Sequence, residues 1–212
     1  MIHVVTPENR HLYEAELLDQ HRLRHQVYIV ERKWRGLEDR GGLEYDRYDT
    51  DETTYLLAIE RGRVIGGTRL FPTLRPHMLE EVCPQLAAVR GIPRAPDICE
   101  WTRIYVTKER REGAYGGAIA GQLFSATFEY CIEHGIRALN VVFEAWWLPR
   151  LSAQGWKMQV LGVPDMIDGD WWMAVTMPID EETLRATRAY NRIEGDILVQ
   201  RGIRRRESGK VA

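Results

Sequence analysis

Two apolar, strand-like segments of this chain carry charged side chains in their interiors. Arg69 lies within the run 64–71, and Glu100 and Arg103 lie within the run 98–106. Strands that build a core are normally apolar, whereas surface charges normally occur in loops and on helix faces. Charges inside core strands are costly unless they are paired, so the fold has to bring opposite charges together there. Paired networks of this kind often mark a functional site.

The bulk composition is that of an ordinary globular protein. The 212 residues include no linker rich in proline, glycine or serine, so we predict one domain over residues 1–201. Residues 202–212 include three consecutive arginines and are expected to form a basic, flexible tail. The formal net charge of -2 argues against a nucleic-acid-binding protein, which would usually be basic.

The cysteines and the apolar runs give no sign of a secreted or membrane protein. Cys83, Cys99 and Cys131 are widely spaced, and three cysteines without a CxxC pair predict neither a disulfide framework nor a zinc site. The N-terminus lacks the pattern of a signal peptide, and no apolar run is long enough to span a bilayer. We therefore expect a cytoplasmic protein with buried reduced thiols, no metal, and no membrane or nucleic-acid partner.

The hydrophobic pattern predicts a succession of helices and strands. A helix is expected from Thr6 to about residue 30, with Leu12, Ala15 and Leu18 on its apolar face. Strands are expected at 55–59, 64–71, 98–106, 138–143, 157–161 and 171–177. Helices are expected at 116–134, 145–154 and after residue 180, with a shorter interrupted piece at 78–88. This order predicts an α/β fold, a single-domain three-layer mixed sheet with helices on both faces, and resembles the acyltransferase (GNAT-like) fold that binds acyl thioesters.

The charged residues in the strands have two competing interpretations. Glu100 and Arg103 are three residues apart, so regular pleating would point them to opposite faces, unless a bulge near Trp101 turns both toward one cleft. If the strand with Arg69 is a neighbour, Glu100 could lie between two guanidinium groups, and its pKa would then be depressed. A catalytic site and a buried ion-pair network that only registers the sheet are equally good interpretations of these residues alone.

Further candidates precede these strands in the chain. Asp46 and Asp49 lie in a loop and could face an amine or a sulfonium, although two solvated acids would be the simpler interpretation. Arg24 and Tyr28 are four residues apart and share a helical face. Tyr28 and Trp34 could enclose a nucleoside or a sulfonium through cation–π contacts, or could only pack the helix against the sheet.

A glycine-containing segment before the clearest helix is a weaker candidate. The stretch 111–117 reads Arg-Glu-Gly-Ala-Tyr-Gly-Gly, and backbone amides at the start of the helix that follows could hold a phosphate group. His21 and His25 have the i, i+4 spacing of a zinc pair, but no third ligand accompanies them, so a metal site is not expected.

Taken together, these residues resemble the acyl-homoserine lactone synthases, the autoinducer synthases of quorum sensing, and among them the subgroup that uses acyl-CoA. The resemblance covers about residues 1–190 and rests on an ordered set in the family's spacing: Arg24, Tyr28, Trp34, Asp46-x-x-Asp49, Arg69 and Glu100-x-x-Arg103. Two departures concern the pocket lining. Tyr28 stands where the family usually has Phe, and Trp101, Thr102 and Ile104 stand in the family's Glu-x-Ser-Arg-Phe segment.

The resemblance implies a reaction without a prosthetic group. S-adenosylmethionine would give its amino group to an acyl thioester, either acyl-CoA or acyl-acyl carrier protein. Its carboxylate would then close on the carbon next to sulfur. The products would be an N-acyl-homoserine lactone, 5′-methylthioadenosine and the free thiol carrier. The sulfonium is an excellent leaving group, so the main tasks of the enzyme would be orientation and deprotonation of the amine.

The resemblance also implies roles for individual residues. Glu100 is the best candidate base, acting through water, with Arg69 and Arg103 holding the charged network. Two further sets follow. The adenosylmethionine pocket would contain Arg24, Tyr28 and Trp34, with Asp46 and Asp49 near its charged end, and the rest of the substrate lining would come from Trp101, Thr102, Val142 and Trp146.

The acyl donor and the reaction class keep alternatives. Trp146 and Trp147 stand where a helix that docks an acidic carrier protein would want lysines, which favours acyl-CoA with a short, branched or aromatic acyl group. Both tryptophans could instead belong to the core. The run 139–142 contains no Ser or Thr, which disfavours a 3-oxo acyl chain. Two other classes of protein also remain open, an N-acetyltransferase acting on another amine and a non-catalytic thioester-binding module. Release of methylthioadenosine would distinguish an acyl-homoserine lactone synthase from both.

Overall fold

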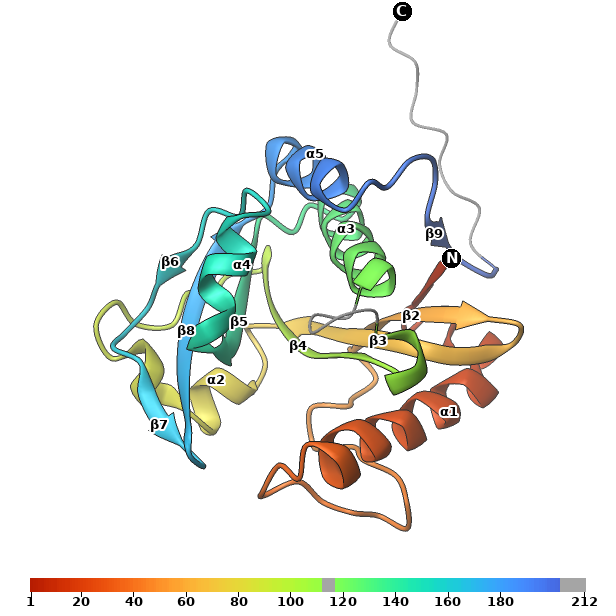
Figure 1. The fold of residues 1–212 in the computed structure, drawn as a ribbon, viewed down its shortest axis with the longest axis horizontal. Helices are drawn as coiled ribbons and strands as arrows, with labels where there is room; N and C mark the ends of the chain where they lie inside the picture. Colours follow the sequence, from red (N-terminus) through yellow and green to blue (C-terminus); the bar gives the residue numbers. More distant parts are fainter. Residues whose placement is uncertain (112–116, 203–212) are drawn as a thin grey trace, which may run out of the picture.

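The computed structural model describes residues 1–111 and 117–202. A mixed β-sheet runs through this part of the chain, and helices cover both of its faces (Figure 1). Helix α1 (Glu14–Arg24) lies on one face, while α3 (Gly117–Glu133) and α5 (Glu181–Tyr190) lie on the other. The predicted three-layer α/β architecture is therefore confirmed.

The sheet has the strand order β6-β8-β5-β4-β3-β2-β1-β9, with β7 paired to β8. Strands β4 and β5 are parallel, whereas β3–β4 and β5–β8 are antiparallel. The strands are β1 Ile2–Val5, β2 Thr54–Glu60, β3 Arg63–Pro72, β4 Ile98–Val106, β5 Ala138–Glu144, β6 Gln159–Val160, β7 Asp165–Ile167, β8 Asp170–Pro178 and β9 Leu198–Val199. The three strands that the sequence pattern missed, β1, β7 and β9, have two to four residues each, too few for an alternating pattern.

The helices agree with the pattern except at the N-terminus. The expected long helix from Thr6 is wrong, because the Asn9 side chain binds the Thr6 amide and the Val4 carbonyl, which turns the chain back onto β1. Helix α1 begins only at Glu14 and continues as the π-helix His25–Glu31. The other helices are α2 Met78–Glu81 and α4 Leu148–Ser152, with 3₁₀ turns at Arg10–Leu12, Pro84–Ala87, Lys108–Arg110 and Ala145–Trp147.

A bulge between β3 and β4 shapes the centre of the sheet. Gly67 pairs with Tyr105 and Arg69 pairs with Thr102, so two residues of β4 stand opposite one residue of β3. Arg103 occupies the bulge with a φ of +55°, a left-handed conformation that is uncommon for a residue with a Cβ. The bulge changes the alternation of side chains, so that Glu100 and Arg103 line the same cavity. The predicted bulge is confirmed, two residues later than Trp101.

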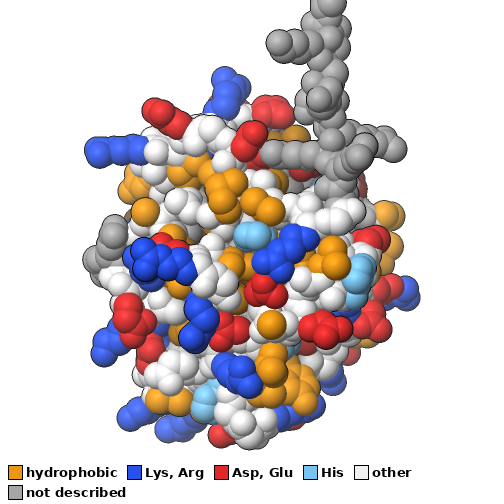
Figure 2. Space-filling model, turned by 90° about the vertical axis from the view of Figure 1, so that its right-hand side faces the viewer, with side chains coloured by type: hydrophobic (Ala, Val, Ile, Leu, Met, Phe, Trp, Pro, Cys, Tyr) orange, Lys and Arg blue, Asp and Glu red, His pale blue; other side chains and the backbone are white. Residues whose placement is uncertain are grey.

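The surface mixes charges of both signs. On the face in Figure 2, basic and acidic side chains are interspersed, with hydrophobic side chains between them. This mixture agrees with the formal net charge of -2.

Candidate active site

Six charged side chains form a closed ring beneath the sheet, on the side of α1. Each of three arginines binds two carboxylates, and each carboxylate binds two arginines. Arg24 lies 2.5 Å from Glu44 and 2.7 Å from Asp49, and Arg69 lies 2.9 Å from Asp49 and 2.7 Å from Asp46. Arg103 closes the ring, 2.8 Å from Asp46 and 3.0 Å from Glu44. The alternation of sign satisfies every member, as burial of charge requires.

The ring holds Glu44 and Asp49 in the ionised form. Burial acts to raise the pKa of Glu44, but Arg103 and Arg24 outweigh it and lower the pKa to about 2. Burial likewise acts to raise the pKa of Asp49, yet Arg69 and Arg24 hold the pKa of that carboxyl well below its usual range. The side chains of Arg24 and Arg69 have no solvent exposure. The ring is therefore a permanently charged, rigid support and not a set of groups that exchange protons near neutral pH.

The ring revises several expectations about its members. Asp46 and Asp49 are not solvated loop acids, because both are paired to arginines of the core. Arg24 binds two ring carboxylates and lines neither of the two cavities described below, although it was expected in a substrate pocket. The structure adds Glu44, which sequence reasoning did not single out as a site residue. The usable signal was a third acid in the same short loop, two residues before Asp46.

Glu100 stands outside the ring. Its Oε1 accepts a hydrogen bond from the Leu79 amide at 2.9 Å, and its Oε2 is buried without a hydrogen-bond partner among the described residues. Burial raises its pKa to about 7, against the opposing effect of the Leu79 and Met78 amides and of Arg69. The expected position between Arg69 and Arg103, with a depressed pKa, is wrong, because both guanidinium groups are committed to the ring acids. A carboxyl with this pKa can take up and release protons at neutral pH.

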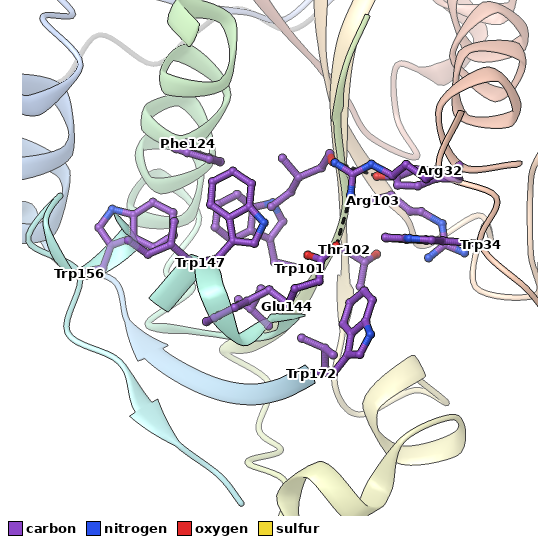
Figure 3. A pocket seen from close by; sticks show the side chains of 16 residues that line it. Arg32, Trp34, Trp101, Thr102, Arg103, Phe124, Glu144, Trp147, Trp156 and Trp172 are labelled. Carbon is purple, nitrogen blue, oxygen red and sulfur yellow. Dashed lines mark hydrogen bonds and ion pairs between the residues drawn. The ribbon is translucent and has the colours of Figure 1, made fainter. Parts of the chain in front are cut away.

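Two adjoining cavities meet at Thr102 and Arg103. The smaller, of about 120 Å³, enters the aromatic core (Figure 3). The larger, of about 510 Å³, contains Glu100 and opens between the π-helix side of the molecule and β8. Val142 and Trp172 also line both cavities. Two substrates held in these cavities would therefore meet beside Glu100.

The smaller cavity has an aromatic wall. Trp101 is buried, and its ring lies 5.8 Å from those of Phe124 and Trp156, centroid to centroid. Its indole nitrogen donates to Thr68, which fixes the ring at the base of the cavity. Trp147 reaches the same cavity from the turn after β5 (Figure 3). This lining excludes water and suits an apolar group of limited size.

An aromatic group and one ion pair stand where the cavities join. Tyr28 and Trp34 are stacked at 4.7 Å, and Trp34 meets the edge of Trp172 at 5.5 Å. The guanidinium of Arg32 lies over both stacked rings and forms a 3.5 Å ion pair with Glu144 at the end of β5. These contacts connect the π-helix to the other half of the sheet. The expected placement of Tyr28 and Trp34 beside a pocket agrees with this geometry.

The remaining candidates are distributed unevenly. Thr102 lines both cavities, and its hydroxyl accepts a hydrogen bond from Arg69. Trp146 is 45% exposed and lines a separate surface groove, whereas its neighbour Trp147 lines the smaller cavity. The glycine-containing segment falls largely on residues 112–116, which lie outside the described residues. The cavity residues that sequence reasoning did not assign to a site share no contiguous motif and include Arg32, Phe124, Glu144, Trp156 and Trp172.

The described residues offer neither a metal site nor a membrane-spanning helix. Within residues 1–111 and 117–202, no group of three or more His, Cys, Asp or Glu side chains could hold a metal ion. No helix in that part of the chain has the length and apolar character needed to cross a membrane.

Comparison with known proteins identifies the family of this chain. The family model of the autoinducer synthases matches residues 8–187. An isovaleryl-homoserine lactone synthase from Bradyrhizobium diazoefficiens is 46% identical over 185 residues, which are 87% of this chain and 82% of that protein. The solved structure of BjaI, a CoA-dependent acyl-homoserine lactone synthase with SAM and isopentyl-CoA, has 43% identity and a TM-score of 0.90, covering 96% of this chain and 94% of that one. The solved structure of MesI, another CoA-dependent acyl-homoserine lactone synthase, has 37% identity and a TM-score of 0.85, covering 93% of this chain and 98% of that one.

A more distant structure shares the fold alone. A putative N-acetyltransferase from Lactobacillus plantarum superposes with a TM-score of 0.51 at 18% identity, covering 84% of this chain and 99% of that one. This likeness confirms the predicted acyltransferase-like fold. Since the family model matches most of its length, the chain belongs to the autoinducer synthase family, the acyl-homoserine lactone synthases.

Proposed function

We propose that this enzyme makes an N-acyl-homoserine lactone from S-adenosylmethionine and a short acyl-CoA, with Glu100 as the base. One observation carries the proposal. Glu100 has a pKa of about 7 and a buried oxygen without a hydrogen-bond partner among the described residues, and it lines the cavity that adjoins an apolar cavity at Thr102 and Arg103. A group that titrates near neutral pH can remove a proton from an ammonium and prepare it for acyl transfer.

The larger cavity would hold adenosylmethionine. Its lining combines Trp34 and Trp172, which can flank a nucleoside or a sulfonium, with basic side chains such as Arg32 that suit a carboxylate. The presence of SAM in the structure of the similar synthase BjaI supports adenosylmethionine as a substrate. In the reaction, the amine loses a proton to Glu100 and attacks the thioester carbon, and the thiolate leaves. The methionyl carboxylate then attacks the carbon beside the sulfonium, and methylthioadenosine departs.

The ring would serve as the support of this site. Arg69 holds the Thr102 hydroxyl at 3.0 Å, and Arg103 stands in the bulge at the junction of the cavities. Because its six charges neutralise one another, the ring positions these groups without placing a net charge beside the substrates. Asp46, the most exposed ring acid at 22%, lines neither cavity and binds both Arg69 and Arg103, so its part in the site would be to hold these two arginines in place.

The smaller cavity would hold the acyl group. Its volume of about 120 Å³ and its wall of tryptophan and phenylalanine favour a short, branched or compact acyl chain. The aliphatic Val142 offers no hydroxyl to a 3-oxo group. The names of the similar proteins, an isovaleryl-homoserine lactone synthase and CoA-dependent synthases, support the choice of acyl-CoA over acyl-acyl carrier protein. Since the reaction would draw on these two metabolites, we place the enzyme in the cytoplasm.

The donor is tested with purified enzyme, adenosylmethionine and matched acyl donors. Isovaleryl-CoA and the same acyl group on acyl carrier protein are compared by methylthioadenosine release and by mass spectrometry of the lactone. We expect the CoA thioester to show the higher kcat/KM, with a KM of roughly 1 μM to 1 mM. A higher kcat/KM for the carrier-linked donor would refute the acyl-CoA assignment. Acyl transfer without methylthioadenosine release would instead indicate an N-acetyltransferase.

The base is tested by Glu100→Gln, which keeps the shape of the side chain. We expect turnover to fall by roughly 10²-fold or more, because the positioned base is lost. The control is Glu52→Gln, which removes an exposed carboxylate paired with Arg75 far from either cavity and should leave turnover unchanged. A folded Glu100→Gln enzyme with near-normal turnover would contradict the assignment.

A further inference from the structure

Two buried side-chain oxygens on neighbouring strands lack hydrogen-bond partners among the described residues. They are Oε2 of Glu100 on β4 and Oδ1 of Asn140 on β5. The two strands are parallel, and Glu100 is paired directly with Asn140 in their register. Residues paired in this way extend their side chains to the same face of the sheet, at adjacent positions. Glu100 is 1% exposed and Asn140 is 0% exposed, so solvent does not satisfy either oxygen.

The orientation of the Asn140 amide is determined by its other partner. Asn140 Nδ2 donates a hydrogen bond to the Pro93 carbonyl at 2.8 Å. A carbonyl oxygen only accepts, so the amide has to present its nitrogen to Pro93, and the opposite flip would set two oxygens against each other. The unpartnered atom of Asn140 is therefore an acceptor. The unpartnered atom of Glu100 is also an acceptor whenever that carboxyl is ionised.

Buried acceptors are normally paired with a donor, and one hydrogen between two acceptors at paired positions satisfies both of them. We propose that Asn140 is a positioning residue for Glu100, and that its Oδ1 accepts the hydrogen which the protonated Glu100 carries on Oε2. Oε1 of Glu100 is already held by the Leu79 amide, which places the proton on the other oxygen. Asn140 lines neither cavity, so it acts through Glu100 and not on the substrates.

This contact makes Glu100 a stronger base. In the ionised form, Oε2 and Oδ1 repel each other, whereas uptake of a proton by Glu100 creates a hydrogen bond. The proton would come from the substrate ammonium and pass later to solvent, while the departing thiolate takes the second proton of the attacking amine. The inference rests on the proposed role of Glu100 in the reaction.

Other charged and polar groups face Glu100 without replacing this contact. Arg69 on β3 and the amides of Met78 and Leu79 favour the carboxylate, and Asp46 favours the neutral acid. The thiol of Cys83, in the segment after α2, also feels the charge of Glu100. None of these groups is an acceptor for Oε2 in the described structure. Asn140 is the side chain whose position and free atom fit that need.

Two substitutions of Asn140 should move the pH profile in opposite directions. Asn140→Leu removes the acceptor, so the acidic limb of kcat/KM should shift to lower pH by roughly half a unit to one unit. Asn140→Asp adds a negative charge at the same position, so the limb should shift to higher pH. The matched control is Thr176→Val, at the position paired with Asn140 on the opposite strand β8, which should leave the limb in place.

A second readout does not depend on activity. The infrared band of the protonated Glu100 carboxyl, isolated as the difference between wild type and Glu100→Gln, should titrate at lower pH in Asn140→Leu and at higher pH in Asn140→Asp. Unchanged titration in the folded variants, or shifts in the same direction, would overturn the proposal. If Asn140→Leu does not fold, the upward shift in Asn140→Asp decides alone. Near-normal activity of Glu100→Gln would remove the catalytic role of Glu100, while the infrared shifts would still test the contact.

Discussion

The same substitution at two buried glutamates should have opposite effects on stability. Glu44 and Glu100 are each 1% exposed, but Glu44 lies between two arginines, whereas Glu100 is in no ion pair and its Oε2 has no hydrogen-bond partner among the described residues. Replacement by glutamine keeps the shape and removes the charge. We expect Glu44→Gln to destabilise the protein at neutral pH and Glu100→Gln to stabilise it above neutral pH.

The magnitudes follow from the two pKa values. The pKa of Glu44 falls from 4.5 to about 2, which corresponds to about 3 kcal/mol of stability that is present above pH 4.5 and is lost as the pH falls through 2. Removing one partner of a buried ion pair costs a similar roughly 3–5 kcal/mol. The pKa of Glu100 rises from 4.5 to about 7, so the native state loses about 3 kcal/mol as the pH rises from 4.5 to above 7.

The assay is denaturant unfolding of both variants and wild type at pH 4, 6 and 8, with the free energy of unfolding as the measured quantity. At pH 8, the free energy of unfolding of Glu44→Gln should be about 3 kcal/mol below that of wild type, which corresponds to a Tm lower by roughly 6 to 12 °C for a domain of this size. The free energy of unfolding of Glu100→Gln should be about 3 kcal/mol above that of wild type. At pH 4, the gain for Glu100→Gln should vanish. The control is Glu52→Gln at the surface, with an expected change within about 0.5 kcal/mol.

Two outcomes would refute this reasoning. A loss below about 1 kcal/mol for Glu44→Gln at pH 8 would mean that the ring is no stronger than a surface ion pair. A destabilised Glu100→Gln at pH 8 would mean that the carboxylate has a partner, which would also remove its high pKa. The predicted gain has a functional meaning, because groups kept in a costly environment are typical of sites where activity outweighs stability.

Two further predictions concern the cavities. Trp34→Ala should raise the KM for adenosylmethionine by roughly tenfold, and should raise the KM for the acyl donor less, because the Trp34 indole stacks on Tyr28 and lines the larger cavity. The control is Trp171→Ala, which changes a tryptophan that is 56% exposed. Equal effects on both KM values would count against this placement. Trp147→Ala should shift the kcat/KM preference toward longer acyl-CoA, because it removes part of the wall of the smaller cavity; Trp146→Ala is the matched control outside that cavity. An unchanged chain-length preference would exclude Trp147 from the acyl site.

Much of the fold could be predicted because it is encoded locally. The strands 98–106 and 138–144 and helix α3 show their periodicity over seven or more consecutive residues, and the structure places them within one or two residues of the expected bounds. The helix predicted from Thr6 was wrong for an equally local reason. Thr6 and the following proline are typical of a helix start, but the Asn9 side chain binds the Thr6 amide and the Val4 carbonyl of β1. A contact of this kind leaves no periodic pattern in the sequence.

The sequence by itself determined that the charges of Arg69 and Arg103 had to be paired with acids, because unpaired charges inside core strands are too costly. Only the tertiary structure decided the partners. Arg24 meets Glu44 across 20 residues and Arg103 meets Glu44 across 59, separations that the order of residues does not rank. With the arginines occupied by the ring, Glu100 is left buried without an ion pair among the described residues. Its pKa of about 7, and with it the capacity to act as a base, comes from burial and is a property of the folded chain alone.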